Sequence, residues 1–260
     1  MSDELLIDHA EGITTLTFNR PHAKNALDLP MRAALREAVH AIRADRNVRA
    51  VILRGSEGNF CSGGDVRGMN VESAEAGRNR VDDLHGWVAQ LLELDRPVIA
   101  AVDGVAYGAG FSFALAADFV IATPRARFCM PFMKVGLVPD CGALYTLPRI
   151  VGMARARDLI FTAREANAEE ARAMGIVLEI AGAEALDARA NAIARALASA
   201  SPAAFALTKR ALNASLTSDL RTMLELESLG QGLAFSTDFH REAVQRFRDK
   251  ATPLFHWPQS

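Results

Sequence analysis

Two short segments are unusually rich in glycine and other small residues: residues 60–65 (FCSGGD) and residues 104–110 (GVAYGAG). Each follows an apolar run typical of a strand, so each is expected to be a loop that turns sharply into a helix. Glycine tolerates positive φ and lets a ligand approach the backbone, and N–H groups at a helix start have no intrahelical partner. Such loops can bind an oxyanion or a phosphate, or they can simply be tight turns.

A third segment, residues 130–142 (MPFMKVGLVPDCG), sets a single acidic residue, Asp140, among apolar neighbours. An isolated carboxylate of this kind is a candidate for chemistry. Its position after Pro139 and before Cys141 and Gly142 equally suits an ordinary turn or a helix cap. From the residues alone both interpretations of Asp140 stay open.

The second glycine-rich loop matches two familiar motifs only in part. A dinucleotide-binding fingerprint needs a small residue where Phe113 stands, and its ribose-binding acid would come later than Asp118. The G-x-S-x-G nucleophile elbow would be centred on Ser112, but Ala114 replaces its last glycine. A dinucleotide site is therefore not expected, and a serine hydrolase stays an alternative that requires a reactive Ser112.

Apolar runs and helical periodicities predict the elements that position these loops. Strands are expected at residues 13–18 (ITTLTF), 51–53 (VIL), 97–102 (PVIAAV) and 119–122 (FVIA), the later ones buried on both faces. A helix over residues 28–45 would be capped by Asp28. A second helix would precede Pro97, with one apolar face formed by Val81, Leu84, Val88 and Leu91. This alternation is typical of an α/β fold with crossover connections.

Beyond about residue 185 the strand signals end, and the last third of the chain is expected to be helical. Ser201, followed by Pro202, is a typical N-cap for one of these helices. We expect this region to pack on the α/β core or on another subunit. A chain of 260 residues has room for one large α/β domain with such an extension.

Composition narrows the range of partners. The formal net charge is -2 and only four of the 29 basic residues are lysines, without any run of them, so no nucleic-acid partner is expected. Cys61, Cys129 and Cys141 suit neither a disulfide framework nor a metal site. The N-terminus lacks the pattern of a signal peptide, and no apolar run reaches about 18 residues. A cytoplasmic location without membrane attachment is expected.

The ordered set of segments resembles the enoyl-CoA hydratase/isomerase, or crotonase, family over nearly the whole chain. The matching pieces are Asn19-Arg20-Pro21, Asn25-Ala26-Leu27, residues 60–65, residues 96–104 running into 108–110, residues 136–139, and Phe247 with Lys250. The resemblance implies a spiral of ββα units, with residues 1–195 as the α/β core and residues 196–260 as a helical oligomerisation region. A homotrimer or a dimer of trimers is then expected.

The resemblance also implies a binding site for an acyl-CoA substrate. The N–H groups of Gly64 and Ala109 occupy the positions of the family's oxyanion hole, which stabilises a thioester enolate. The coenzyme A portion would be bound by Lys24, Ala26, Ser62, Gly63, Gly64, Asp65, Phe247 and Lys250, the last two reaching in from a neighbouring subunit. Plain surface charge is the alternative for Lys24 and Lys250. No metal is implied, and no cofactor beyond the coenzyme A of the substrate.

The departures from the family pattern bear on the reaction. Hydratases of the family use two glutamates, and Ser112 and Phe132 stand at their positions, so the usual two-glutamate hydration is not available. Asp140 occupies the position of the single acid/base residue of several isomerases. Burial among Phe132, Val138 and Leu144 is expected to raise its pKa. An enoyl-CoA isomerase is therefore the first expectation.

His85 leaves a further alternative open. It is expected on the apolar face of its helix, where a core histidine with a satisfied hydrogen bond is the ordinary interpretation. In 4-chlorobenzoyl-CoA dehalogenase, another member of the family, a histidine at this position activates water after an aspartate at the Asp140 position attacks. Dehalogenase-like hydrolysis therefore ranks after isomerisation and hydration, beside a non-catalytic acyl-CoA-binding protein.

Overall fold

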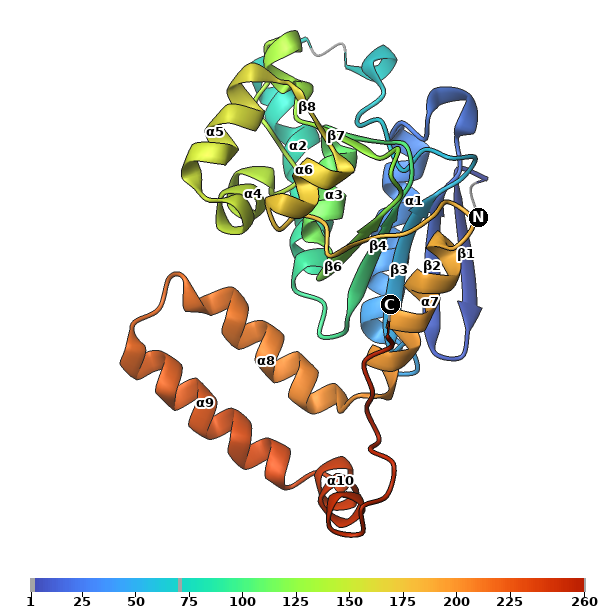
Figure 1. The fold of residues 1–260 in the computed structure, drawn as a ribbon. Helices are drawn as coiled ribbons and strands as arrows, with labels where there is room; N and C mark the ends of the chain where they lie inside the picture. The colour runs from blue at the N-terminus through green and yellow to red at the C-terminus, as the bar shows by residue number, and fades with distance from the viewer. Residues whose placement is uncertain (1–2, 70–71, 260) are drawn as a thin grey trace.

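A mainly parallel sheet forms the centre of the molecule in the computed structural model, which describes residues 3–69 and 72–259 (Figure 1). The strands of this sheet are β1 (Leu5–Ala10), β2 (Ile13–Phe18), β3 (Ala50–Gly55), β4 (Val98–Val102), β6 (Phe119–Ala122) and β9 (Glu179–Ile180). Their order is β1-β2-β3-β4-β6-β9, and only the β1–β2 pair is antiparallel. The four predicted strands are therefore confirmed as the centre of this sheet.

Helices cover both faces of the sheet, and the last three helices of the chain extend beyond it (Figure 1). The helices are α1 (Leu29–Ala44), α2 (Ala74–Leu92), α3 (Ala109–Ala116), α4 (Ala143–Val151), α5 (Met153–Thr162), α6 (Ala168–Ala173), α7 (Leu186–Ser199), α8 (Pro202–Ser215), α9 (Leu220–Phe235) and α10 (Asp238–Arg248). The predicted cap of α1 is confirmed, because the Asp28 carboxylate accepts a hydrogen bond from the N–H of Met31 (3.0 Å). Ser201 likewise caps α8.

Alternate side chains of the strands enter two separate cores. One core lies between the sheet and α7 and includes Ile52, Ile99 and Ile121. The larger core contains the other face of the sheet, with Val51 and Val98, together with the buried sides of α1, α2 and α3. Because side chains of a strand point alternately to opposite faces, strands buried on both faces are apolar throughout, as predicted.

A small second sheet carries the loop before α3. Its strands are β5 (Val105–Tyr107), β7 (Arg127–Cys129) and β8 (Glu165–Asn167), with β5 parallel to β7 and β7 antiparallel to β8. These strands have three residues each and were not predicted, because so short a run has no readable alternation. They fix the chain between β4 and α3, where the second glycine-rich loop lies.

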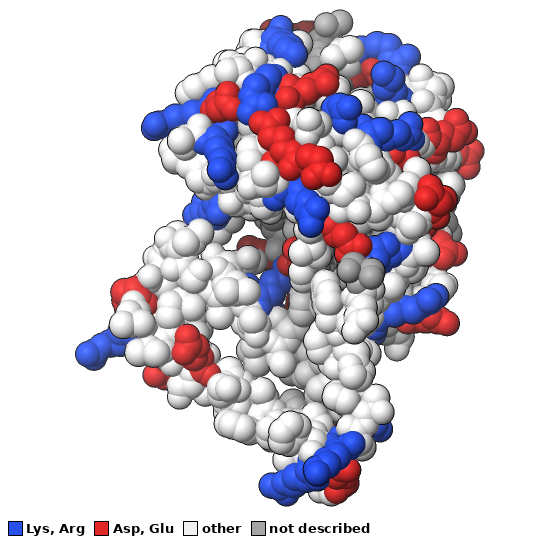
Figure 2. Space-filling view, viewed as in Figure 1, with Lys and Arg blue, Asp and Glu red and all other residues white. Residues whose placement is uncertain are grey.

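The helices α8, α9 and α10 extend away from the sheet (Figure 1). Leucines on α8 and α9 are exposed, among them Leu212, Leu220, Leu229 and Leu233. The surface of these two helices carries few charged groups, and a hollow separates them from the core (Figure 2). None of the helices in the described parts of the chain is both long and apolar enough to span a bilayer.

Candidate active site

The two glycine-rich segments lie side by side and are joined by backbone hydrogen bonds. The N–H of Cys61 donates to the carbonyl of Val105, and the N–H of Tyr107 donates to the carbonyl of Cys61, both at 2.9 Å. A Cβ on Gly110 would lie 2.2 Å from the Cys61 carbonyl oxygen, so only glycine permits this approach. The second loop turns directly into α3 as predicted, with Gly108 as its N-cap at φ 52°.

The first loop does not turn directly into a helix, so that prediction is wrong. A short 3-10 turn, η2 (Val66–Gly68), follows the loop, and α2 begins only later. The loop is held instead by a parallel bridge to Leu27. The N–H of Leu27 donates to the carbonyl of Gly63 (2.8 Å), and the N–H of Asp65 donates to the carbonyl of Leu27 (2.9 Å). This bridge makes no use of the N–H of Gly64.

Gly64 and Ala109 each present a backbone N–H that the protein does not use. Ala109 is the first residue of α3, so its N–H has no intrahelical acceptor. Across residues 3–69 and 72–259, neither N–H donates to another backbone group. The two loops approach each other at their glycines: a Cβ on Gly63 would lie 3.6 Å from the Cα of Gly108. One donor from each loop suits an oxyanion between them.

Asp140 lies in the connection between η3 (Pro131–Val135) and α4 and does not cap a helix. The N-cap of α4 is Gly142, and no side chain caps that helix. The Oδ1 atom of Asp140 is buried and has no hydrogen-bond partner among the described residues. An uncompensated carboxylate oxygen is costly to ionise, so this group is suited to taking up a proton.

Burial raises the pKa of Asp140 above its ordinary value, as predicted. A hydrogen bond with the Cys141 side chain and the positive charges of Arg32 and His85 act in the opposite direction, without cancelling it. The expected source of this burial is only partly right. Phe132 is buried, but Val138 and Leu144 are exposed and cannot keep water from the carboxyl.

Neither position of the family's glutamates offers a free acid here. Ser112 is fully buried in α3, and its hydroxyl lies 3.1 Å from the carbonyl oxygens of both Gly108 and Asp140. The ring of buried Phe132 would lie 3.7 Å from a Cβ built on Gly108, so it packs against the second loop. Asp140 therefore remains the candidate acid.

The prediction that His85 faces the core is wrong. On α2 the buried positions are Leu84, Trp87, Val88 and Leu91, whereas His85 is exposed. Its charge still acts on the carboxyl of Asp140, lowering that group's pKa. His85 thus lies near the candidate acid without belonging to the apolar face of its helix.

Comparison with known proteins decides the family. The family model described as enoyl-CoA hydratase/isomerase matches residues 8–258. The chain belongs to the enoyl-CoA hydratase/isomerase family. It is 37% identical to the 1,2-epoxyphenylacetyl-CoA isomerase of Escherichia coli (strain K12) over 257 residues, covering 97% of this chain and 98% of the relative. It is 40% identical to a probable enoyl-CoA hydratase of Rhodobacter capsulatus over 252 residues, covering 95% of both.

Solved structures confirm the crotonase fold with its helical C-terminal region. The crystal structure of an enoyl-CoA hydratase/isomerase from Cupriavidus metallidurans CH34 superimposes with a TM-score of 0.94 at 41% identity, covering 99% of this chain and 98% of that one. The protein is therefore an acyl-CoA enzyme of the crotonase family. Membership leaves the choice between isomerase and hydratase to the residues of the site.

Most of the residues that were predicted to bind coenzyme A gather around the first loop. Lys24 has φ 49° and its carbonyl accepts from the N–H of Ser62 (3.0 Å), while Ala26 is buried. The Asp65 carboxylate is engaged by Arg20 (3.1 Å) and Arg67 (2.7 Å), which hold its pKa far below the ordinary range. The Asp65 side chain is therefore already engaged within the protein, and the N–H of Asp65 donates to Leu27.

Phe247 and Lys250 are not brought to the site by this chain. Phe247 lies on α10 with 85% of its side chain exposed, and Lys250 follows that helix. In Figure 1, α10 lies at the far end of the molecule from α3. Their predicted role in binding coenzyme A can therefore be met only from another subunit.

Two arginines near the site were missed by the sequence analysis. Arg32 on α1 and Arg80 on α2 are half-buried, and the charges of both act together with that of Asp140. A Cβ on Gly64 would lie 3.5 Å from Nη2 of Arg32. The sequence did not indicate that these arginines lie near the site, because an arginine on an amphipathic helix is ordinarily solvated.

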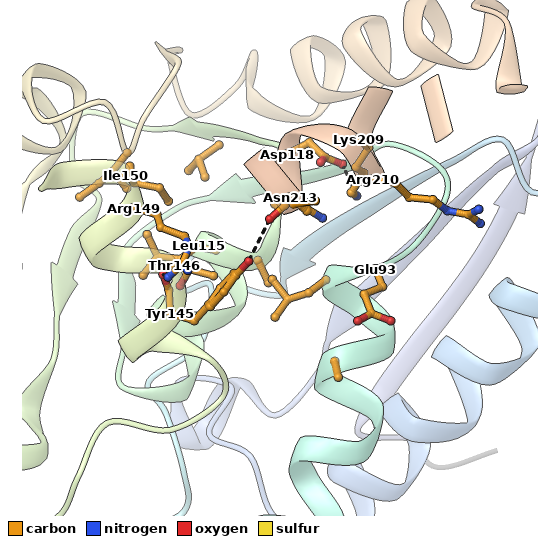
Figure 3. A pocket seen from close by; sticks show the side chains of 18 of the residues that line it. Glu93, Leu115, Asp118, Tyr145, Thr146, Arg149, Ile150, Lys209, Arg210 and Asn213 are labelled. Carbon is orange, nitrogen blue, oxygen red and sulfur yellow. Dashed lines mark hydrogen bonds and ion pairs between the residues drawn. The ribbon is translucent and has the colours of Figure 1, made fainter. Parts of the chain in front are cut away.

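A large cavity of the described structure lies elsewhere, between the core and α8 (Figure 3). Its volume is about 920 Å³, and it is lined by residues of α2, α3, α4 and α8, with Asp118 and Lys209 at one side. The hydroxyl of Tyr145 donates to the carbonyl of Asn213 across it (3.2 Å). Asp140, Gly64 and Ala109 do not line this cavity, so it is separate from the oxyanion loops.

Proposed function

We propose that this protein is an acyl-CoA isomerase that moves a proton along the acyl chain through Asp140. The observation that carries the proposal is the buried Asp140 carboxyl, with an unpartnered oxygen and a raised pKa. The N–H groups of Gly64 and Ala109, which donate to no other backbone group in the described structure, would form the oxyanion site. Isomerisation needs one group that both takes and returns a proton, and one oxyanion site.

In the proposed reaction the Asp140 carboxylate removes a proton from a carbon of the acyl group. The electron pair of that C–H bond passes into the conjugated system and places negative charge on the thioester oxygen. Gly64 and Ala109 donate hydrogen bonds to this oxygen. The protonated Asp140 then returns its proton to the other end of the system, so the product has the same composition as the substrate and the carboxylate is restored.

Hydration is the alternative within the family, and several relatives are named as hydratases. It requires a group that activates water and a group that delivers the proton. Ser112 and Phe132 hold those positions here, one hydrogen-bonded to carbonyl groups and one in the core. The relative named as an isomerase supports the first choice. The double-bond position within the acyl group is left to experiment.

The test incubates enoyl-CoA and aryl-CoA thioesters with the protein in deuterated water and follows the mass and position of deuterium. We expect the double bond to move without addition of water, with deuterium entering the acyl chain where protonated Asp140 exchanges with solvent, and loss of both the shift and the exchange in Asp140→Asn. Asp8→Asn, which changes an exposed aspartate of β1, is the matched control. Addition of water that continues unchanged in Asp140→Asn would contradict the proposal, and so would binding of the thioesters with neither a double-bond shift nor deuterium exchange.

The helical C-terminal region is proposed to join subunits into a homotrimer or a dimer of trimers. Exposed leucines on α8 and α9 give these helices an uncovered apolar surface of the kind that subunit contacts bury. This arrangement would also bring Phe247 and Lys250 of one subunit to the coenzyme A site of another. The boundary near residue 196 and a cytoplasmic location belong to the same proposal. Sedimentation velocity of the full chain measures the subunit number.

A further inference from the structure

Two guanidinium groups converge beside the oxyanion loop from different helices. Nη2 of Arg32 lies 3.5 Å from where a Cβ on Gly64 would stand, and Nη2 of Arg80 lies 4.0 Å from the corresponding point on Gly68. Arg32 comes from α1 and Arg80 from α2, so the packing of these helices brings both cations to one end of the first loop. The charge of Arg80 is also coupled to that of Asp140.

Neither guanidinium is neutralised by the protein. Among the described residues, no carboxylate lies within ion-pair distance of Arg32 or Arg80, and the buried Nε of Arg32 has no hydrogen-bond partner. Their neighbours on the same helices differ: Arg36 pairs with Asp83 (3.0 Å), and Arg78 pairs with Asp82 (3.4 Å). Arg32 and Arg80 thus differ from these neighbouring arginines, because in the described part of the chain they face the site without a carboxylate partner.

This arrangement is unfavourable unless a ligand compensates it. Burial and the nearby charge of Arg32 both lower the pKa of Arg80, and only the charge of Asp140 opposes them. Two cations face one carboxyl, which itself ionises reluctantly. The site thus keeps a surplus of positive charge in a half-buried place, which an anion would remove.

We propose that Arg32 and Arg80 bind a carboxylate carried by the acyl group of the substrate, so that the natural substrates are thioesters of dicarboxylic acids. The inference rests on the proposed function, because it takes Gly64 and Ala109 as the place of the thioester oxygen. Asp140 then marks the acyl side of that oxygen. The charges of Arg32 and Arg80 both act together with that of Asp140, so we assign the two arginines to the same, acyl side of the oxyanion site.

The chemistry of the pair favours a carboxylate over a neutral polar group. A planar guanidinium forms two parallel hydrogen bonds to a carboxylate, and such charge-assisted pairs are about twice as strong as neutral ones. A hydroxyl or an epoxide oxygen would leave the surplus charge in place. The competing role for Arg32 is to stabilise the enolate itself, which would act on every substrate alike and not on carboxylated ones in particular.

The test measures binding by calorimetry with saturated thioesters, which bind but have no double bond to move. The probes are malonyl-, succinyl-, glutaryl- and adipyl-CoA, each compared with the acyl-CoA of equal length that ends in a methyl group. We expect at least one carboxylated member to bind about tenfold more tightly than its uncharged counterpart. Arg32→Gln and Arg80→Gln are each expected to reduce this preference to less than about threefold.

Arg36→Gln and Arg78→Gln are the matched controls, because they remove exposed arginines from the same two helices and are expected to keep the preference. The proposal is overturned if the unmodified protein prefers no carboxylated length. It is also overturned if Arg32→Gln weakens both members of a pair equally, which would assign Arg32 to the thioester oxygen. Because these thioesters need no proton transfer by Asp140, a failed isomerase assay would leave this result unaffected, and the two proposals fail separately.

Discussion

The hydroxyl of Ser112 lies 3.1 Å from the backbone carbonyl oxygen of Asp140, and at the same distance from that of Gly108. It therefore links the loop that carries the candidate acid to the loop that carries the Ala109 donor. Ser112 stands at the position that the resemblance assigns to a glutamate in hydratases of the family. Here its hydroxyl is expected to hold Asp140 in place relative to the oxyanion site. In the proposed isomerase, the serine that replaces the hydratase glutamate is also the residue that positions Asp140.

Ser112→Ala is expected to lower kcat for isomerisation by about tenfold, because a hydrogen bond worth about 1 kcal/mol no longer holds the Asp140 loop. KM is expected to stay within about twofold, since Ser112 is buried and contacts no ligand surface. Steady-state kinetics in the variant measure both quantities. Ser199→Ala, which removes an exposed serine bonded to its own helix, is the control. An unchanged kcat in Ser112→Ala would refute the positioning role.

Asp140→Asn is expected to stabilise the fold at neutral pH while abolishing isomerisation. The pKa of Asp140 is raised in the folded state, so its contribution to stability is full below the ordinary pKa and is lost as pH rises through the folded pKa. An uncharged amide does not ionise, so the variant does not lose this stability as the pH rises. Each kcal/mol gained corresponds to a rise of about 2–4 °C in Tm.

Differential scanning fluorimetry between pH 4 and pH 8 measures this effect. We expect the Tm difference between Asp140→Asn and the unmodified protein to grow with pH and to vanish at the acid end. A difference that is constant with pH would mean that the asparagine acts through packing rather than through charge.

The sequence predicted the centre of the fold because that part has strong local signals. Four apolar strands and the Asp28 cap of α1 were read correctly, since burial on both faces and capping both leave a pattern in neighbouring residues. The edge strand β1 and the short strands of the second sheet were missed. The strands of the second sheet pair with partners that are distant in the chain, such as β7 for β5, and β1 is largely exposed, so its sequence has little apolar alternation.

The candidate site was predictable only where a motif marks it. The glycine-rich loops and Asp140 stand out by spacing, whereas Arg32 and Arg80 reach the site only through the packing of α1 against α2. The error at His85 has a related cause. Its spacing from Val81 suggested one apolar face, but α2 buries the side that includes Trp87 instead.

His85→Gln distinguishes isomerisation from dehalogenase-like hydrolysis. If Asp140 only moves protons, the exposed His85 is dispensable, and isomerisation is expected to fall by less than about threefold. If Asp140 displaces a leaving group and forms an ester that water must cleave, loss of the histidine would stop turnover after one equivalent of the leaving group. Rapid-quench kinetics with an aryl-CoA thioester measure such a burst. A stoichiometric burst in the variant would favour hydrolysis over the proposed reaction.

Gly110→Ala is expected to disrupt the oxyanion loop, because the added Cβ would lie 2.2 Å from the Cys61 carbonyl oxygen. Overpacking of this kind costs roughly 3 kcal/mol of unfolding free energy. Gly86→Ala is the matched control: it lies within α2 with nothing within 4 Å of the new Cβ, and alanine in a helix is favoured by up to about 1 kcal/mol. Urea denaturation should show a lower free energy of unfolding for Gly110→Ala and a higher one for Gly86→Ala. Equal destabilisation of the two variants would contradict the close contact at Gly110.

Lys209→Met is expected to loosen α8 from the core. The Lys209 ammonium donates to the Asp118 carboxylate (2.7 Å) and to the carbonyl of Arg96 (3.3 Å), and it is the one residue of α8 that is buried in the described structure. Removal of one partner leaves Asp118 as an uncompensated buried charge, which typically costs about 3–5 kcal/mol. Figure 3 shows this pair beside the cavity under α8.

The destabilisation caused by Lys209→Met is expected to depend on pH through the ionisation of Asp118. Burial already raises the pKa of Asp118 against the opposing charge of Lys209, so Lys209→Met raises that pKa further. The destabilisation should therefore be largest above neutral pH and smaller at acid pH, where Asp118 is protonated. The double variant with Asp118→Asn is expected to recover most of the stability, because no buried charge remains. Urea denaturation at pH 5 and pH 8 measures both effects, and a loss equal at the two pH values would mean that Lys209 acts through packing alone.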